Sequence, residues 1–452
     1  MRNVLVAAVV AALCFACNGA DQSYLEVPPT PRRAAVWVDE NGLDAATSER
    51  MRAAGVDEIV VRIGGLNLAG QAPVLRFTPT AHVEGGIPVG IVLEVEGARP
   101  GLGETAAEAV WRALDNELRG KTPAEIILDT PRLSEGFDQF AESLTEVSGV
   151  SVVPLLSFEQ LQEEDGLRLA SVARTVVIPA FGSDGADLRG IGDLDPLPLS
   201  EKLEPLVGVD VKVRLAVVLS PRTDPAIEGP GDDLDPLTEV ATVSTASILD
   251  RTFTFDRALT WSGRSWKPGD TLALRWVDAA KLQAALKEIH RLAMPEVAGW
   301  DLVSLPPEER SLGLGRDTLL RYLEGEGPEP SIEIRAERDG RNLRVFLANT
   351  GPFVTAVTNH GNWVQVSVED GWIQARDSGS FDGLRLGNSV NGEWRESDLD
   401  RFNAVRFTEV YLGPGEHLDS GSVRLPSTRT RALIGWHLTL SDGSSVSGRL
   451  VR

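Results

Sequence analysis

From Ala34 onward, short runs of β-branched residues alternate with stretches whose apolar residues recur at helical spacing. This alternation is typical of βα units, in which each helix returns the chain so that the next strand can pair in parallel with the last. Eight strands are predicted, at residues 35–38, 58–63, 88–94, 124–129, 150–156, 175–180, 211–219 and 298–305. The fifth, sixth and seventh are almost entirely apolar, as expected of strands that are buried on both faces.

Helical patterns lie between most of these strands, at residues 43–54, 104–119, 134–147, 278–292 and 316–323. Residues 67–86 show little helical periodicity, so the second and third units are expected to be irregular. Eight βα units within residues 34–326 match the size of a TIM-like (β/α)8 barrel. The sequence therefore predicts an α/β fold built on such a barrel.

An insertion is predicted after the seventh strand, near residues 221–276. It contains two alternating runs, Thr252–Phe255 and Thr271–Leu274, and the composition of residues 267–270 (Lys-Pro-Gly-Asp) is typical of a tight turn. We expect a β-hairpin that overhangs the strand-seven end of the barrel. Its tryptophans, Trp261 and Trp266, are candidate substrate-binding residues because indole faces stack on sugar rings. The alternative is that they fill a small hydrophobic core.

A second domain is predicted over residues 329–452, after a linker rich in Gly, Pro and Glu at residues 325–330. Beyond the linker, apolar residues recur at every second position, as in residues 343–347 and 364–368. Asp-Gly pairs, which favour turns, separate several of these runs. The pattern predicts an antiparallel β-sandwich of immunoglobulin-like size.

The N-terminal residues indicate export. Arg2 precedes an apolar stretch at residues 4–16, which is shorter than the roughly 20 residues that a transmembrane helix needs. Leu13 and Ala16, placed just before Cys17, resemble the bacterial lipobox. This resemblance implies that Cys17 becomes the new N-terminus and is acylated. The alternative is a plain signal peptide, with Cys17 removed or left as an unpaired thiol.

We therefore predict a lipoprotein signal peptide at residues 1–17 and a tether at residues 18–33, which contains three prolines. The predicted location is the cell envelope, with the chain attached to the membrane through the lipid at Cys17, on the periplasmic face or at the cell surface. No cysteine follows Cys17, so the exported domains must be held by their cores without disulfides.

The charge of the chain narrows the possible partners. It contains 44 Lys and Arg against 66 Asp and Glu, a net charge of −22. Such a surface repels phosphate backbones, so nucleic acid is not expected as a partner. The five histidines show no HExxH or other metal-ligand spacing, and no motif indicates a cofactor, so neither a metal nor a cofactor is predicted.

Three strand-forming segments carry a family resemblance. Ile126–Asp129, Val153–Phe158 and Thr175–Gly182 resemble strands of a family of exported bacterial proteins that is a domain of unknown function with a glycosidase-like barrel. The second ends in a Ser-aromatic pair, and the third runs into an aromatic residue and a glycine. The resemblance covers about residues 34–320 and implies the barrel fold. It implies no catalytic role, because the family has no established chemistry.

Charged residues lie at the carboxyl ends of the first four predicted strands, either on the strand or just after it: Asp39, Arg62, Glu94, Glu96 and Asp129. The carboxyl ends of barrel strands form the mouth where TIM-barrel sites lie, so we expect these side chains to meet there. Asp129 and Glu94 are the candidate catalytic acids, and the other three are candidate substrate-binding residues. The alternative is that Arg62 only neutralises an acid in a structural ion pair.

Two functions remain open, and whether the chain is an enzyme is left undecided. One is a carbohydrate-active hydrolase that uses Asp129 and Glu94. The other is a non-catalytic envelope lipoprotein that binds a glycan through its barrel or an envelope protein through its sandwich. We favour the second, because glycosidases need two carboxylates that flank the bond. The seventh strand offers no acid before Asp224.

The anchoring hypothesis can be tested at Cys17. Replacing Cys17 with Ser removes the thiol that would be acylated, so we expect the protein to move from the membrane fraction to the soluble fraction. Immunoblotting of the two fractions measures this shift. An unchanged membrane fraction in Cys17→Ser would show that the lipobox interpretation is wrong.

Overall fold

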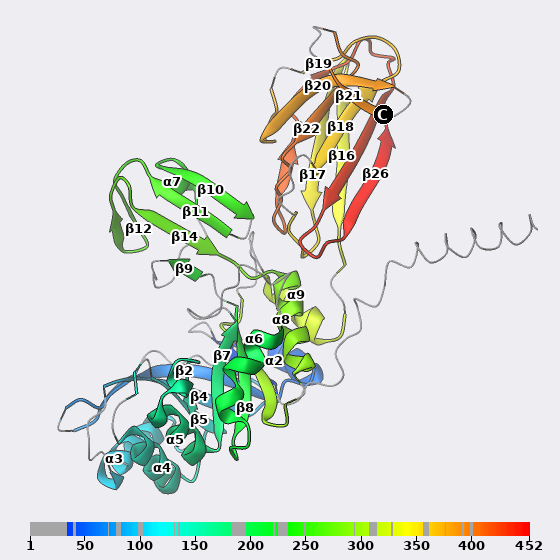
Figure 1. The fold of residues 1–452 in the computed structure, drawn as a ribbon. Helices are drawn as coiled ribbons and strands as arrows, with labels where there is room; N and C mark the ends of the chain where they lie inside the picture. The colour runs from blue at the N-terminus through cyan, green and yellow to red at the C-terminus, as the bar shows by residue number, and fades with distance from the viewer. Residues whose placement is uncertain are drawn as a thin grey trace, which may run out of the picture.

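The structure is a computed structural model, and it describes most of the chain after residue 33. The described ranges are 34–38, 42–70, 72–77, 83–97, 103–130, 132–133, 136–181, 196–219, 222–224, 234–247, 250–292, 294–306, 314–326, 329–355, 361–375, 377–390, 393–397 and 401–452. The predicted signal peptide, the tether and Cys17 lie outside these ranges. Figure 1 shows three parts of the chain: a barrel, a smaller sheet inserted in it, and a pair of C-terminal sheets.

Eight parallel strands form a closed barrel. They are β1 (Ala34–Val38), β2 (Glu58–Asn67), β4 (Val89–Glu96), β5 (Glu125–Asp129), β6 (Ser151–Leu155), β7 (Thr175–Phe181), β8 (Lys212–Val218) and β15 (Val297–Val303). Each pairs with the next in chain order, and β1 pairs with both β2 and β15, which closes the ring. All eight strands were predicted from the sequence, and the prediction is confirmed.

Helices follow seven of the eight strands within the described residues. They are α2 (Ala45–Ala53), α3 (Glu104–Glu117), α4 (Phe137–Ser148), η2 (Gln160–Gln162), α5 (Glu164–Ala173), α6 (Pro196–Lys202), η4 (Glu204–Leu206), α8 (Ala279–Arg291) and α9 (Arg316–Leu323). Their apolar faces pack on the outer face of the barrel in one hydrophobic cluster. After β2 the described chain instead forms a short strand, β3 (Val74–Phe77), which pairs antiparallel with the end of β2. This is the irregular unit expected from residues 67–86.

The insertion after β8 is larger than the predicted hairpin. It contains β9 (Arg222–Asp224), α7 (Asp235–Thr238), β10 (Ala241–Ser247), β11 (Asp250–Phe255), β12 (Leu259–Trp261), β13 (Arg264–Trp266) and β14 (Thr271–Arg275). Four of these strands form an antiparallel sheet in the order β10-β11-β14-β9, and β12 pairs with β13. The expected turn at residues 267–270 is present, with Asp270 accepting a hydrogen bond from the Lys267 backbone at 2.8 Å.

Two antiparallel sheets form the C-terminal part, as the alternating pattern predicted. The five-stranded sheet contains β16 (Ile332–Asp339), β17 (Asn342–Asn349), β19 (Gln374–Ala375), β23 (His417–Asp419) and β24 (Val423–Arg424). The six-stranded sheet contains β18 (Trp363–Val368), β20 (Gly383–Val390), β21 (Glu393–Glu396), β22 (Ala404–Thr408), β25 (Ala432–Thr439) and β26 (Ser445–Val451). Leu343 and Val345 of one sheet share a core with Val364 and Val366 of the other.

One end of the C-terminal sheets lies close to helices α8 and α9 of the barrel (Figure 1). Phe353 and Leu440 belong to the hydrophobic cluster that covers the barrel. One polar contact joins the two parts: Ser441 donates a hydrogen bond at 2.5 Å to Asp278, the residue that caps the N-terminus of α8. Burial raises the pKa of Asp278, while its hydrogen bonds with Ser441 and the Lys281 backbone act in the opposite direction.

The interior of the barrel contains a buried ionic layer in addition to its apolar side chains. Arg214 of β8 donates two hydrogen bonds to Glu125 of β5, at 2.8 and 2.6 Å, and one to Asp301 of β15 at 3.1 Å. Asp301 also accepts from the Trp37 indole at 2.9 Å. Arg214, Glu125 and Asp301 are at most 2% exposed. Burial alone lowers the pKa of Arg214, but the charges of Asp301 and Glu125 raise it above its usual value.

A glycine makes room for this layer. A Cβ atom on Gly90 of β4 would lie 2.3 Å from a carboxylate oxygen of Glu58 and 3.1 Å from the Glu125 side chain. Glu58 is itself buried, at 1% exposure, and its charge acts on Arg214. The small residue on β4 therefore allows acidic side chains from β2 and β5 to share the interior.

Removing the cation of this layer should be costly. Arg214→Met leaves at least two buried carboxylates without their guanidinium, so we expect the free energy of unfolding to fall by about 3–5 kcal/mol. Urea denaturation measures the change. The control is Arg168→Met, which removes an exposed guanidinium that pairs with Asp138 and Asp165 on the outer helices and should leave stability close to that of the parent. Equal stability of the two variants would contradict a structural role for the layer.

The C-terminal sheets should fold without the barrel, because they have their own core. A fragment of residues 329–452 should unfold in one cooperative transition with a β-sheet circular dichroism spectrum. It should melt below the full chain, since it lacks the contacts of Phe353, Leu440 and Ser441 with the barrel. A fragment without a cooperative transition would show that the sheets depend on those contacts.

Candidate functional site at the barrel mouth

The end of β2 is shaped by a bulge. The pairing of β2 with β4 shifts register between Arg62 and Gly64, so the chain departs from regular geometry directly after the arginine. Gly64 adopts a φ of 149°, and a Cβ there would lie 2.1 Å from the Arg76 carbonyl oxygen of β3. Glycine at this position thus allows β3 to pair closely with the end of β2. The bulge is of the kind that re-aims side chains at the rim of a barrel.

Arg62 joins two acids from neighbouring strands. It donates from Nη1 to Glu94 of β4 at 2.9 Å and from Nη2 to Asp129 of β5 at 3.3 Å. Glu94 and Asp129 are paired residues in the register of the two strands, so their side chains lie on the same face. These three residues were expected to lie together at the carboxyl ends of their strands, and the structure places them in contact there. Their catalytic or binding roles remain predictions.

The cluster is open to solvent, unlike the ionic layer deeper in the barrel. The side chains of Arg62 and Glu94 are each 50% exposed, and that of Asp129 is 26% exposed. Burial raises the pKa of Asp129; the charge of Arg62 acts against this and that of Glu94 adds to it. The cluster therefore presents one guanidinium and two carboxylates, and burial raises the pKa of one of these carboxylates, that of Asp129.

The other predicted site residues lie elsewhere or are not described. Glu96 is exposed near the end of β4, and the structure gives it no contact with Arg62. Asp39 lies outside the described residues. Trp261 and Trp266 are 8% and 2% exposed in the core of the insertion, where the Trp266 ring stacks on Phe255 at 4.9 Å. This is the arrangement that the core-packing alternative predicts for the two tryptophans.

A second group of residues supports the loop after Asp129. The side-chain amide of Gln160, on the segment after β6, donates to the carbonyl of Thr130 at 2.9 Å, and its oxygen accepts from the Ser157 backbone at 2.7 Å. Gln160 is 8% exposed. These bonds tie the residue that follows Asp129 to the end of the next strand. Sequence reasoning missed Gln160, because a glutamine at the start of a short helix carries no positional signal.

Among the strand ends that the structure describes, the acids of the mouth lie on the neighbouring strands β4 and β5. β6, β7, β8 and β15 end in Leu155, Phe181, Val218 and Val303, and none of these is acidic. Both acids of the cluster also bind the same guanidinium, rather than facing each other across an open space. Among the residues that the structure describes, no group of His, Cys, Asp or Glu side chains is arranged to hold a metal. No helix in the described ranges is long and apolar enough to cross a membrane.

Comparisons with known proteins give little beyond this geometry. No family model and no curated protein matches the chain. Among solved structures, it is similar to a Bacillus subtilis protein, ydhD, described as a sporulation-specific glycosylase, with 11% identity and a TM-score of 0.29 over 47% of this chain and 80% of the other. A DUF4466 family protein from Parabacteroides merdae ATCC 43184 matches with 11% identity and a TM-score of 0.16, over 27% of this chain and 42% of that one. At these scores neither likeness carries an argument about function.

Proposed function

We propose that the chain is an envelope lipoprotein whose TIM-like barrel binds a glycan at the mouth without cleaving it. The observation that supports this proposal is the exposed cluster of Arg62, Glu94 and Asp129. Carboxylate oxygens accept hydrogen bonds from sugar hydroxyls, and a guanidinium donates to them. Such charge-assisted bonds are stronger than neutral ones, so three groups at one rim can fix a sugar ring.

The placement of the acids favours binding over hydrolysis. A glycosidase needs one carboxylate on each side of the scissile bond, about 5 Å apart or more according to the mechanism. Here Glu94 and Asp129 come from adjacent strands and are tied to the same arginine. Arg62 also stabilises the charged form of Asp129, which opposes its use as a proton donor.

One observation favours the alternative, a carbohydrate-active hydrolase. The pKa of Asp129 is raised despite Arg62, because burial and the charge of Glu94 outweigh the cation. A raised carboxyl pKa is what a general acid requires. In this alternative Asp129 protonates the leaving group and Glu94 is the second carboxylate.

The test is Asp129→Asn, measured by glycan-array binding, turnover and thermal unfolding. Losing a charged acceptor should weaken glycan binding about 10-fold or more, since such hydrogen bonds contribute about 1.5–3 kcal/mol. Because the folded-state pKa of Asp129 is raised, its charge costs stability above that pKa, and the cost is relieved as the pH falls through it. The neutral amide should therefore leave the melting temperature near pH 7 unchanged or slightly raised.

The matched control is Asp138→Asn, which alters a carboxylate that pairs with Arg168 at 2.7 Å on the outer helices. Binding should be unchanged in this variant. If the parent cleaves a glycan and Asp129→Asn abolishes the cleavage, the hydrolase alternative is correct. If Asp129→Asn binds glycans as the parent does, or loses binding together with several degrees of melting temperature, the cluster is a structural ion pair and the proposal is wrong.

A further inference from the structure

One row of residues across the six-stranded sheet brings three arginines to the same face. Arg385 of β20 pairs with Arg406 of β22, and Arg406 pairs with Gln365 of β18. Gln365 pairs with Gly435 of β25, which pairs with Arg449 of β26. Directly opposite residues in antiparallel strands point to the same side of the sheet. The row therefore crosses five strands.

This row faces away from the core. Val364 and Val366, the neighbours of Gln365, lie in the hydrophobic cluster shared by the two C-terminal sheets, as does Val405, the neighbour of Arg406. Side chains alternate between the two faces of a strand, so Gln365 and Arg406 lie on the outer face. The arginine row thus belongs to the surface of the C-terminal part.

Two tryptophans hold the central arginine. The Arg406 guanidinium lies 4.4 Å from the centre of the Trp363 ring and 4.5 Å from that of Trp394. The Nε and Nη2 groups of Arg406 donate hydrogen bonds to the side-chain oxygen of Gln365, at 3.2 and 2.8 Å. The remaining nitrogen, Nη1, has no hydrogen-bond partner among the described residues. The guanidinium is therefore fixed in place with one donor group unused.

Within the part of the sheet that the structure describes, two of the three arginines of the row have no acidic partner. Arg385 pairs with Glu396 at 3.3 Å, whereas Arg406 and Arg449 form no ion pair with any residue that the structure describes. Burial, together with the charge of Arg385, lowers the pKa of Arg406 to about 10. The whole chain carries a net charge of −22, so acidic side chains are abundant in the sequence. A half-buried cation left without one of them is a candidate anion site.

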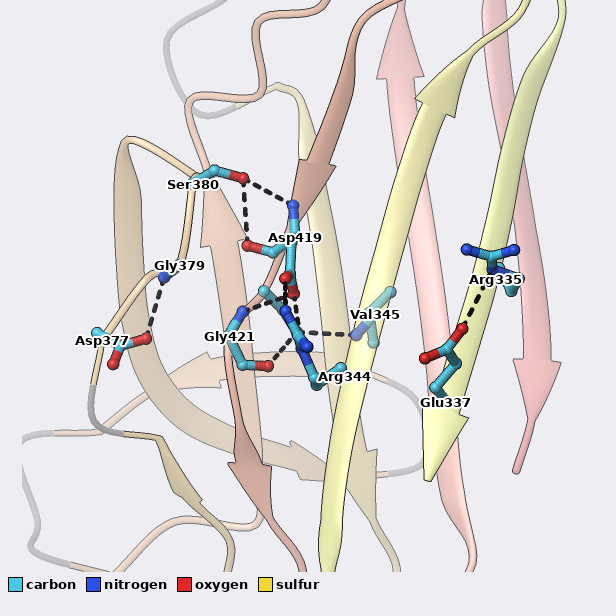
Figure 2. A network of polar contacts seen from close by, with 10 residues as sticks. Arg335, Glu337, Arg344, Val345, Asp377, Gly379, Ser380, Asp419 and Gly421 are labelled. Carbon is cyan, nitrogen blue, oxygen red and sulfur yellow. Dashed lines mark hydrogen bonds and ion pairs between the residues drawn. The ribbon is translucent and has the colours of Figure 1, made fainter. Parts of the chain in front are cut away.

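The other C-terminal sheet shows the contrasting case. Arg344 also lies over an aromatic ring, Phe346, at 5.2 Å, but it donates hydrogen bonds to the carboxylate of Asp419 (Figure 2). Arg335, on the neighbouring strand, lies 3.6 Å from Glu337. The stacked arginines of that sheet are thus neutralised within the protein, whereas Arg406 is not.

We propose that the outer face of the six-stranded sheet binds an acidic sugar, with the acid group on the Arg406 guanidinium. The ligand carboxylate would supply the acceptor that Nη1 of Arg406 lacks, and a hydrogen bond from a guanidinium to a carboxylate is charge-assisted and therefore stronger than a neutral one. Trp363 and Trp394 are both only partly buried, and their rings would give the sugar ring a flat apolar surface beside the guanidinium. This site goes beyond the proposed glycan site at the barrel mouth and does not depend on it.

The experiment uses the full chain and two matched probes, tetragalacturonate and its methyl ester, measured by isothermal titration calorimetry. The probes share the same sugar backbone and differ in the charge of the carboxyl groups. We expect the acid to bind about 10-fold or more tightly than the ester, the effect of one charge-assisted hydrogen bond. Equal affinities, or no binding of the acid at millimolar concentration, would overturn the proposal.

Three substitutions locate the binding. Arg406→Gln should weaken tetragalacturonate binding about 10-fold or more. Arg449→Gln, at an exposed position of the same row, should weaken tetragalacturonate binding by a smaller factor. If Arg406→Gln does not fold, the result for Arg449→Gln tests whether the row binds the acid. Arg344→Gln removes a stacked arginine that already has an acid partner, so it should bind as the parent does. If Arg344→Gln loses as much affinity as the other two, the proposed site is wrong.

The two proposed glycan sites can be told apart in the same assay. Asp129→Asn alters the barrel mouth and should leave tetragalacturonate binding unchanged, because Asp129 and Arg406 belong to different parts of the chain. If Asp129→Asn abolishes this binding while Arg406→Gln leaves it intact, the acidic sugar is bound at the mouth and the C-terminal site is excluded.

Discussion

The described part of the barrel is organised around a buried cation, Arg214. Arg214 of β8 binds Asp301 of the neighbouring strand β15 and also Glu125 of β5, which does not lie next to β8 or β15 in the sheet. A cation in such a place is stable only if its hydrogen bonds are supplied, and it therefore restricts which residues can face it. Gly90 meets this restriction by leaving space for Glu58 and Glu125. The ion pairs that connect strands across the barrel thus require particular inward-facing residues, among them a glycine at position 90.

The same chemistry appears at two depths with different consequences. Near the base of the barrel, one arginine and its acids are at most 2% exposed, and the ion pairs are fully used within the protein. At the mouth, the side chains of Arg62 and its acids are 26–50% exposed and are accessible from the solvent. The buried cluster around Arg214 and the exposed cluster around Arg62 contain the same residue types. They differ in their exposure to solvent, and only the cluster around Arg62 is accessible to a ligand.

The sequence was sufficient to predict the barrel strands and the contact of Arg62 with Glu94 and Asp129, because both follow from short-range patterns. Strand order in a parallel barrel fixes which carboxyl ends are neighbours, so three charged residues on consecutive strands must lie close together. Arg214 was not predicted as a core residue, since its acids, Glu125 and Asp301, are about 90 residues away in the chain. Their pairing depends on register and inward orientation, which no local pattern contains.

The insertion and the C-terminal sheets show a second limit of local patterns. The alternating runs at Thr252–Phe255 and Thr271–Leu274 predicted two strands, and these are the β11 and β14 pair. The flanking strands β9 and β10 are short or polar and gave no comparable signal. On the six-stranded sheet, Trp363, Trp394 and Arg406 are far apart in sequence, so only the register of β18, β20, β21 and β22 brings them together.

The bond between Asp278 and Ser441 also has a consequence for the order of folding. The two residues are 163 positions apart, and Asp278 caps a helix of the barrel. During synthesis, α8 leaves the ribosome long before the turn that carries Ser441, so the buried carboxylate of Asp278 lacks one of its hydrogen-bond donors until that turn has been made. The start of α8 therefore reaches its final environment only when the turn between β25 and β26 docks on it. A chain shortened at its C-terminus would therefore disturb a helix within the barrel.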